Sequence, residues 1–176
     1  SPAAVPSSED PPPAPEQAAA MLDVPLPITV QRLTGAVPGW AVLQGGKVAG
    51  FVGSTWEIAN TVGYSGRPIN VLFAVTPEAR IGGATLVLHN EPVLTLGISD
   101  TDIATYVEGF RGFDLSTAGK GESAGKLPPI ISRATVSTGV IRDGILRSAR
   151  ALALGQGLLA SAGIDRVAFK PATWSD

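Results

Sequence analysis

Two pairs of apolar segments, each pair separated by a turn sequence, constrain the fold more than any other feature of this chain. The first pair is residues 40–44 (WAVLQ) and residues 47–52 (KVAGFV), joined by Gly45 and Gly46. Paired glycines readily take the positive φ values that a tight hairpin turn needs. The sequence therefore predicts a β-hairpin here.

A second hairpin is predicted further along the chain. Residues 68–75 (PINVLFAV) and residues 80–89 (RIGGATLVLH) are both apolar, and residues 76–79 (TPEA) separate them, with Pro77 at a position that suits a turn. Two hairpins without an intervening crossover helix favour an antiparallel sheet.

Helical patterns follow these strands. Residues 101–110 (TDIATYVEGF) come after Ser99, a good N-cap residue, and predict a short helix. A longer helix begins near Val136, and Asp143 and Arg147 form an i,i+4 pair on it. Its apolar stripe recurs at helical spacing and consists of Ile141, Ile145, Ala149 and Leu152. The chain is therefore predicted to be an α+β domain with a small, mainly antiparallel sheet.

The composition changes along the chain and suggests three parts. The first 20 residues hold six of the 15 prolines, no basic residue and few large apolar side chains, which is typical of an extended, disordered segment. We expect residues 1–21 to be such a leader, residues 22–165 the folded domain and residues 166–176 a tail. Ser1 does not open the basic and apolar pattern of a signal peptide, so we interpret it as a mature or trimmed start.

Charge and composition exclude several classes of function. The chain of 176 residues has 13 basic and 15 acidic side chains and a net charge of −2, so we expect no general electrostatic grip on nucleic acid. It has no cysteine and one histidine, which excludes disulfides, thiolate sites and a multi-histidine metal site. The longest apolar run, residues 149–163, is interrupted and too short for a membrane span. We expect a soluble domain.

Hydroxyl side chains gather where the long helix begins. Ser132, Thr135, Ser137 and Thr138 lie just before or within its first turn, and Arg133 adds a positive charge. Unpaired backbone N–H groups and the positive end of the helix dipole make such a place suited to a phosphate or carboxylate. The simpler alternative is that Ser132 or Thr135 only caps the helix.

Residues 132–135 (SRAT) resemble the S/T-G-A-T motif of the FMN-binding domain family. In that family a flavin transferase esterifies the phosphate of FMN to the last Thr of the motif, which here is Thr135. Residues 63–71 (GYSGRPINV) and residues 88–98 (LHNEPVLTLGI) resemble the glycine-rich segment and the strand-end His-x-Glu-Pro of the same family. The three stretches occur in the family's order, and the resemblance extends over roughly residues 50–154.

The resemblance implies a set of cofactor residues. Thr135 would carry FMN through a phosphoester, its neighbours would position the phosphate, and the other two stretches would line the ring or the ribityl chain. The implied residues besides Thr135 are Ser132, Arg133, Ala134, Val136, Ser137, Gly63, Tyr64, Ser65, Gly66, Arg67, His89 and Glu91. A plain loop at residues 63–67 and a structural histidine at position 89 remain alternatives. No catalytic residue and no metal ligand is predicted, and none of the three tryptophans is assigned to the site.

The same resemblance implies a function. The chain is most similar to the subgroup that serves bacterial nitrous oxide respiration, so we expect a periplasmic electron-transfer domain of an inner-membrane flavoprotein. The expected partners are the flavin transferase and, as redox partner or maturation target, nitrous oxide reductase, with effects on expression of the denitrification apparatus. Contact with the membrane would come only through segments outside these 176 residues.

Two positions depart from the family motif and support alternatives. Arg133 occupies the position of the motif's Gly, and Pro129 occupies a position where an acidic residue is common. A transferase that reads those positions would leave the chain unmodified. The first alternative is a flavin-free sensory or protein-interaction domain of a membrane regulator. The second is a domain that holds a free phosphate or carboxylate at the helix N-terminus.

Overall fold

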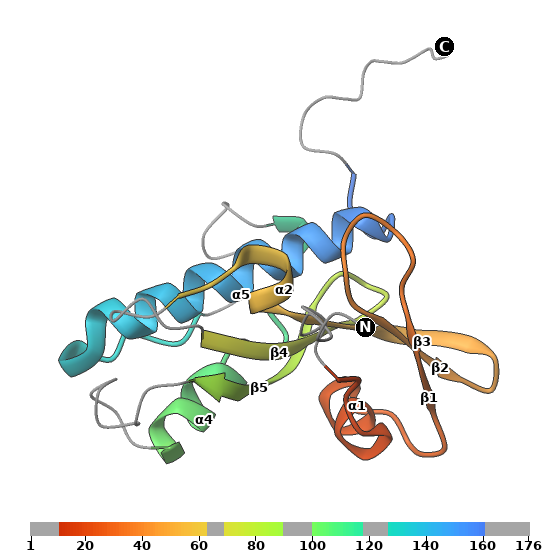
Figure 1. Ribbon diagram of the computed structural model, residues 1–176, viewed down its shortest axis with the longest axis horizontal. Coiled ribbons are helices and arrows are strands. Elements are labelled where there is room, and N and C mark those ends of the chain that lie inside the picture. Colours follow the sequence, from red (N-terminus) through yellow and green to blue (C-terminus); the bar gives the residue numbers. More distant parts are fainter. Residues whose placement is uncertain (1–10, 63–68, 90–99, 118–126, 161–176) are drawn as a thin grey trace, which may run out of the picture.

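The computed structural model describes residues 11–62, 69–89, 100–117 and 127–160. These residues form a five-stranded antiparallel sheet in the order β1-β2-β3-β4-β5, with helices packed against it (Figure 1). The strands are β1 (Thr29–Arg32), β2 (Trp40–Gln44), β3 (Lys47–Ser54), β4 (Ile69–Val75) and β5 (Ile81–His89). The helices are α1 (Pro15–Leu22), α2 (Thr55–Ala59), α4 (Asp100–Glu108) and α5 (Thr135–Gly155), with short 3-10 turns η1 (Leu115–Thr117) and η3 (Ser132–Ala134). The prediction of an α+β fold is confirmed.

Both predicted hairpins are present. β2 and β3 pair antiparallel across Gly45 and Gly46, whose φ values of 57° and 81° are the left-handed values that the turn requires. β4 and β5 pair antiparallel across residues 76–79, where the amide of Ala79 donates to the carbonyl of Thr76. β1 adds a further strand beside β2, which no sequence pattern had predicted.

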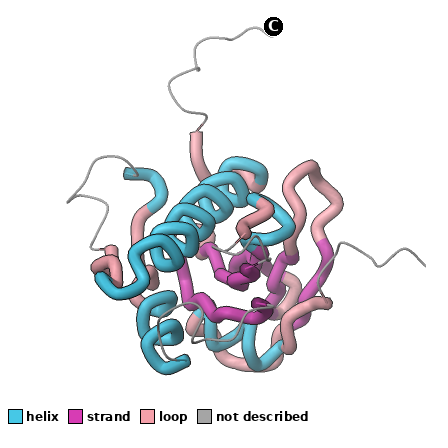
Figure 2. The backbone as a smooth tube through the Cα atoms, turned by 60° about the vertical axis from the view of Figure 1, so that its left-hand side comes forward, coloured by secondary structure: helices cyan, strands magenta, loops and turns pink. Residues whose placement is uncertain are grey.

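The long helix α5 covers one face of the sheet, and the strands curve beneath it (Figures 1 and 2). Its predicted apolar stripe is buried, and it packs with alternate residues of β4. These buried residues are Ile141, Ile145, Ala149 and Leu152 of α5 and Val71, Phe73 and Val75 of β4. Among the described helices, none is both long enough and apolar enough to cross a lipid bilayer.

The opposite face of the sheet is covered by α1, and here the sequence prediction was wrong. Residues 15–22 form a helix instead of an extended leader, because Pro15 begins it and an alanine-rich turn follows. Ala18, Ala19 and Leu22 are buried against Leu72 and other residues of that face. The folded domain therefore begins before residue 22, while residues 1–10 and 166–176 lie outside the described part of the chain.

Glycines allow α1 to lie directly on the strands. A Cβ on Gly82 would meet the carbonyl oxygen of Met21 at 2.4 Å, and one on Gly50 would meet Leu22 at 2.4 Å. Arg111, which follows α4, donates to the carbonyls of Met21 at 3.2 Å and Ala20 at 3.3 Å. These bonds supply a donor to carbonyl groups at the end of α1, where the Ala20 carbonyl also accepts from the amide of Asp23.

Candidate functional site

The proposed attachment segment is a tight turn that leads into a helix. Residues 132–134 form η3, the amide of Ala134 donates to the carbonyl of Ile131 at 2.9 Å, and α5 begins at Thr135. The side chains of Ser132 and Thr135 are exposed. The acceptor hydroxyl that the resemblance singled out is therefore accessible.

No side chain caps the N-terminus of α5. Ala134 is the N-cap residue, and neither η3 nor α5 has a side-chain cap hydrogen bond. The hydroxyl of Thr135 donates to the carbonyl of Ser132 at 3.0 Å instead of accepting from a backbone amide. The simpler alternative, that Ser132 or Thr135 only caps the helix, is therefore wrong. The backbone N–H groups of the first turn of α5 therefore have no side-chain cap as acceptor.

The other residues of the segment divide into buried and exposed. Ser137 and Thr138 are buried, and the hydroxyl of Thr138 donates to the carbonyl of Ala134 at 2.8 Å. Ala134 is also buried, whereas Val136 is 59% exposed. Of the predicted phosphate-site residues, Ser137 can therefore contribute its backbone amide but not an exposed hydroxyl. The side chain of Arg133 lies outside the described part of the structure.

The two other predicted stretches include the paired ends of two neighbouring strands. His89 ends β5 and is paired in register with Ile69, which begins β4. Residues 63–67 precede Ile69 along the chain, and Glu91 follows His89. Gly63, Tyr64, Ser65, Gly66, Arg67 and Glu91 lie outside the described residues, as does the side chain of His89. Their predicted roles stay predictions.

Hydrogen bonds join the residues that follow α2 to the start of β4. The amide of Ile69 donates to the carbonyl of Thr61 at 3.1 Å, and the hydroxyl of Thr61 donates to the carbonyl of Ile69. Thr61 is also within hydrogen-bond distance of the hydroxyl of Thr55, 3.0 Å away, and that hydroxyl accepts from the amide of Val71 at 3.0 Å. These buried hydroxyls fix the two ends of the segment that contains residues 63–68.

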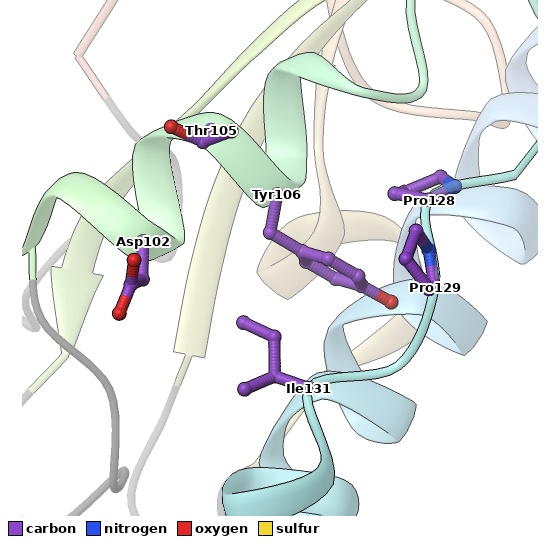
Figure 3. A pocket seen from close by; sticks show the side chains of 6 residues that line it. All are labelled: Asp102, Thr105, Tyr106, Pro128, Pro129 and Ile131. Carbon is purple, nitrogen blue, oxygen red and sulfur yellow. The ribbon is translucent and has the colours of Figure 1, made fainter.

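An apolar pocket of about 280 Å³ lies beside the attachment segment, between α4 and residues 128–131. Figure 3 shows the ring of Tyr106 reaching from α4 toward this segment, with the side chain of Ile131 directed toward the ring. The pocket is lined by Asp102, Thr105 and Tyr106 of α4 and by Pro128, Pro129 and Ile131.

These pocket residues were not among the candidates predicted from the sequence. The available signal was the apolar run of residues 128–131 immediately before the motif. Its partners on α4 are more than 20 residues away, so spacing alone could not bring them together.

Tyr106 links the pocket to the start of α5. Its hydroxyl donates to the carbonyl of Thr138 at 3.2 Å, and its ring packs edge-to-face against Phe110 with the centroids 5.5 Å apart. Burial raises the pKa of Tyr106 above its usual value of 10.0, and the positive charge of Arg142 partly opposes this shift. The phenol therefore stays protonated at neutral pH and can act as the donor.

A second hollow follows α5 on another side of Thr135. This groove of about 430 Å³ lies between residues 59–62 and the first three turns of α5, and Thr135 and Val136 contribute to its wall. Gly139 leaves space in it, because a Cβ at this position would meet nothing within 4 Å. At its far end Asp143 and Arg147 form the predicted ion pair at 2.9 Å, with both side chains largely exposed.

Comparison with curated proteins finds homologous segments within longer bacterial proteins. NirI of Paracoccus denitrificans is 56% identical over 176 residues, which cover 98% of this chain and 25% of NirI. The regulatory protein NosR of Stutzerimonas stutzeri is 22% identical over 147 residues, covering 77% of this chain and 20% of NosR. NosR of Pseudomonas aeruginosa is 28% identical over 133 residues, covering 73% of this chain and 18% of NosR.

These comparisons establish homology to a part of NirI and of NosR. The chain spans about a quarter of the length of NirI and about a fifth of the length of each NosR. No protein-family model matches the chain, and no solved structure matches it. NosR represents the subgroup that the sequence was expected to resemble most, so that part of the resemblance is confirmed, while membership of the FMN-binding family stays a prediction.

Proposed function

We propose that this chain is an electron-transfer domain that carries one FMN, joined through its phosphate to the hydroxyl of Thr135. The observation that carries the proposal is the exposed hydroxyl of Thr135 at the uncapped N-terminus of α5. Oγ1 of Thr135 would attack the phosphorus of an activated FMN donor held by the transferase, lose its proton and displace the donor's leaving group, so that the net gain in mass is one FMN less one water.

The electrostatics of this position support a phosphoester. A phosphodiester keeps one negative charge, and the N-terminus of a helix stabilises negative charge through its dipole and its unpaired N–H groups. α5 has 21 residues and no acidic side chain in its first turn. The chain therefore presents no carboxylate in that turn to repel the phosphate.

The pocket beside Tyr106 supports a place for the flavin ring. Pro128, Pro129 and Ile131 form an apolar wall opposite α4, and this wall ends just before the attachment motif. An isoalloxazine ring is a flat aromatic system, and ligand pockets typically combine apolar walls with a few polar groups. Bound FMN would supply the redox chemistry, whereas these residues would hold the ring and limit the access of water to it.

The homologues support a role for the domain in denitrification. Two of them are named regulatory proteins, and NirI comes from a denitrifying bacterium by its species name. We place the domain in the periplasm, as part of a longer protein that reaches the membrane through other segments. Its electrons would serve denitrification, with nitrous oxide reductase as the proposed partner and a flavin transferase as the enzyme that attaches FMN.

The alternative is a flavin-free sensory or interaction domain. Arg133 and Pro129 depart from the family motif, and both NosR homologues are named regulatory proteins. Under this alternative the exported chain remains unmodified even when the transferase is present.

Substitution of the acceptor tests the proposal. Thr135→Val removes the hydroxyl and nearly preserves the shape of the side chain, so the variant is expected to lack covalent flavin when it is exported from a host that has the transferase. Ser137→Ala is the matched control, because it removes a buried hydroxyl from the same turn and is expected to keep the flavin. Covalent flavin in Thr135→Val would assign the attachment to another residue.

A further inference from the structure

Tyr106 belongs to three features at once. It lies on α4, its ring forms a wall of the pocket next to the attachment motif, and its hydroxyl reaches the first turn of α5. The side chain is 4% exposed. In Figure 3 its ring extends from α4 toward the length of chain that leads into η3.

The hydrogen bond from Tyr106 to Thr138 connects the two sides of the pocket. One wall of the pocket is α4, and the other is the segment of residues 128–131 that continues through η3 into α5. Thr138 is itself anchored, because its hydroxyl donates to the carbonyl of Ala134 at 2.8 Å. This bond therefore joins α4 to the turn of α5 that begins with Thr135.

We propose that Tyr106 is a positioning residue, a latch between α4 and the first turn of α5 that holds the Thr135 hydroxyl in register with the adjacent pocket. The identity of the ligand rests on the proposed function, namely FMN attached to Thr135 with its ring in the pocket. The hydrogen bond that forms the latch lies within the chain and does not depend on that ligand. This role needs an apolar ring in the pocket wall and a hydroxyl that donates to the Thr138 carbonyl, and a tyrosine side chain has both.

The ring of Tyr106 also packs against another aromatic residue of the core. Phe110, four residues further on, is fully buried and meets the ring edge-to-face at 5.5 Å. This contact does not involve the hydroxyl, so Tyr106→Phe keeps the ring and its packing while it removes the bond to Thr138. Phe110→Leu does the reverse, because it disturbs the packing and leaves the hydroxyl in place.

Hydrogen exchange on the flavin-free chain tests the latch. The amides of residues 139–142 donate to the carbonyls of the first turn in an α-helix. Tyr106→Phe is expected to raise their exchange rates about fivefold relative to the amides of β4, which is the size of effect expected for one lost hydrogen bond. Phe110→Leu is expected to raise both sets together. An unchanged ratio in Tyr106→Phe would overturn the latch.

Flavin fluorescence on the modified protein tests the contact with the ligand. A phenol ring against an excited flavin quenches its emission, and a phenylalanine ring does so far less. Tyr106→Phe is therefore expected to be brighter than the parent protein, while Phe110→Leu is expected to match it. Equal emission from the Tyr106→Phe variant with FMN mapped to Thr135 would overturn the placement of the ring beside Tyr106. Absence of FMN from Thr135 in the parent protein would instead overturn the proposed function, and the exchange ratio would still decide on the latch.

Discussion

At the scale of single residues, the buried hydroxyls of α5 differ in whether they have partners. Thr138 donates to the carbonyl of Ala134, whereas the hydroxyl of Ser148 is fully buried and has no hydrogen-bond partner among the described residues. A buried polar group without a partner loses its hydration and gains nothing in return.

Ser148→Ala is therefore expected to raise the free energy of unfolding by about 1 kcal/mol. Thr138→Val, which removes a hydroxyl that has partners, is expected to lower it by about 1 kcal/mol. Urea denaturation of both variants measures the two changes. A clear loss of stability in Ser148→Ala would mean that this hydroxyl has a partner in solution.

The raised pKa of Tyr106 predicts a dependence of stability on alkaline pH. The unfolded chain releases this proton near the usual pKa of 10.0, and the folded protein releases it at higher pH because burial disfavours the phenolate. The contribution to stability is thus complete below pH 10 and is lost as the pH rises through the folded pKa.

Thermal unfolding of the parent protein and of Tyr106→Phe, measured from neutral pH to above pH 10, tests the prediction. The difference between their unfolding temperatures is expected to shrink above pH 10, because only the parent must keep a buried phenol protonated. Tyr64 is the other tyrosine and is common to both proteins, so its titration cancels in the comparison. A difference that stays constant would contradict the raised pKa.

At the scale of elements, two of the three glycines of α5, Gly139 and Gly144, have opposite surroundings. A Cβ on Gly139 would meet nothing within 4 Å, whereas a Cβ on Gly144 would meet Cγ2 of Thr61 at 2.4 Å. Thr61 cannot easily move away from this Cβ, because its hydroxyl donates to the carbonyl of Ile69 and lies 3.0 Å from the hydroxyl of Thr55.

Gly139→Ala is therefore expected to stabilise the protein by about 1 kcal/mol through helix propensity. In Gly144→Ala the same gain is opposed by overpacking of about 1 to 3 kcal/mol, so a net loss of stability is expected. Chemical denaturation of the two variants gives the sign of each change directly. A stabilised Gly144→Ala would contradict the close packing of α5 against the connection between α2 and β4.

Local sequence patterns correctly predicted the elements whose formation depends on residues close together in the sequence. The Gly45-Gly46 turn specifies one hairpin, and the spacing from Ile141 to Leu152 specifies the buried face of α5. α1 was missed because the prolines that precede it and its own alanines are typical of disorder, although its apolar face is buried against a sheet surface formed later in the chain. Only tertiary contacts stabilise such a short helix.

At the scale of the whole molecule, the candidate attachment residue could be predicted from the sequence, but the pocket could not. Thr135 followed from a compact motif, and the structure leaves it exposed at a helix end. The pocket joins α4 to residues 128–131, two segments whose proximity depends on how α4 and α5 pack beside the sheet. No local pattern contains that information.

The arrangement of layers explains how the domain would present a flavin. α5 and α4 contribute to the core on one side of the sheet, and α1 covers the other side (Figure 1). The attachment segment begins α5, so one end of the molecule holds the candidate cofactor site while the sheet provides a rigid base. A redox partner could then approach that end without any change in the core.

The most direct test of the proposed flavin attachment is the intact mass of the chain exported from a host that has the flavin transferase, followed by peptide mapping across residues 132–138. We expect a mass increase of one FMN less one water, mapped to Thr135 and absent from Thr135→Val. An unmodified mass from the same host would contradict the attachment and would favour the flavin-free interaction domain.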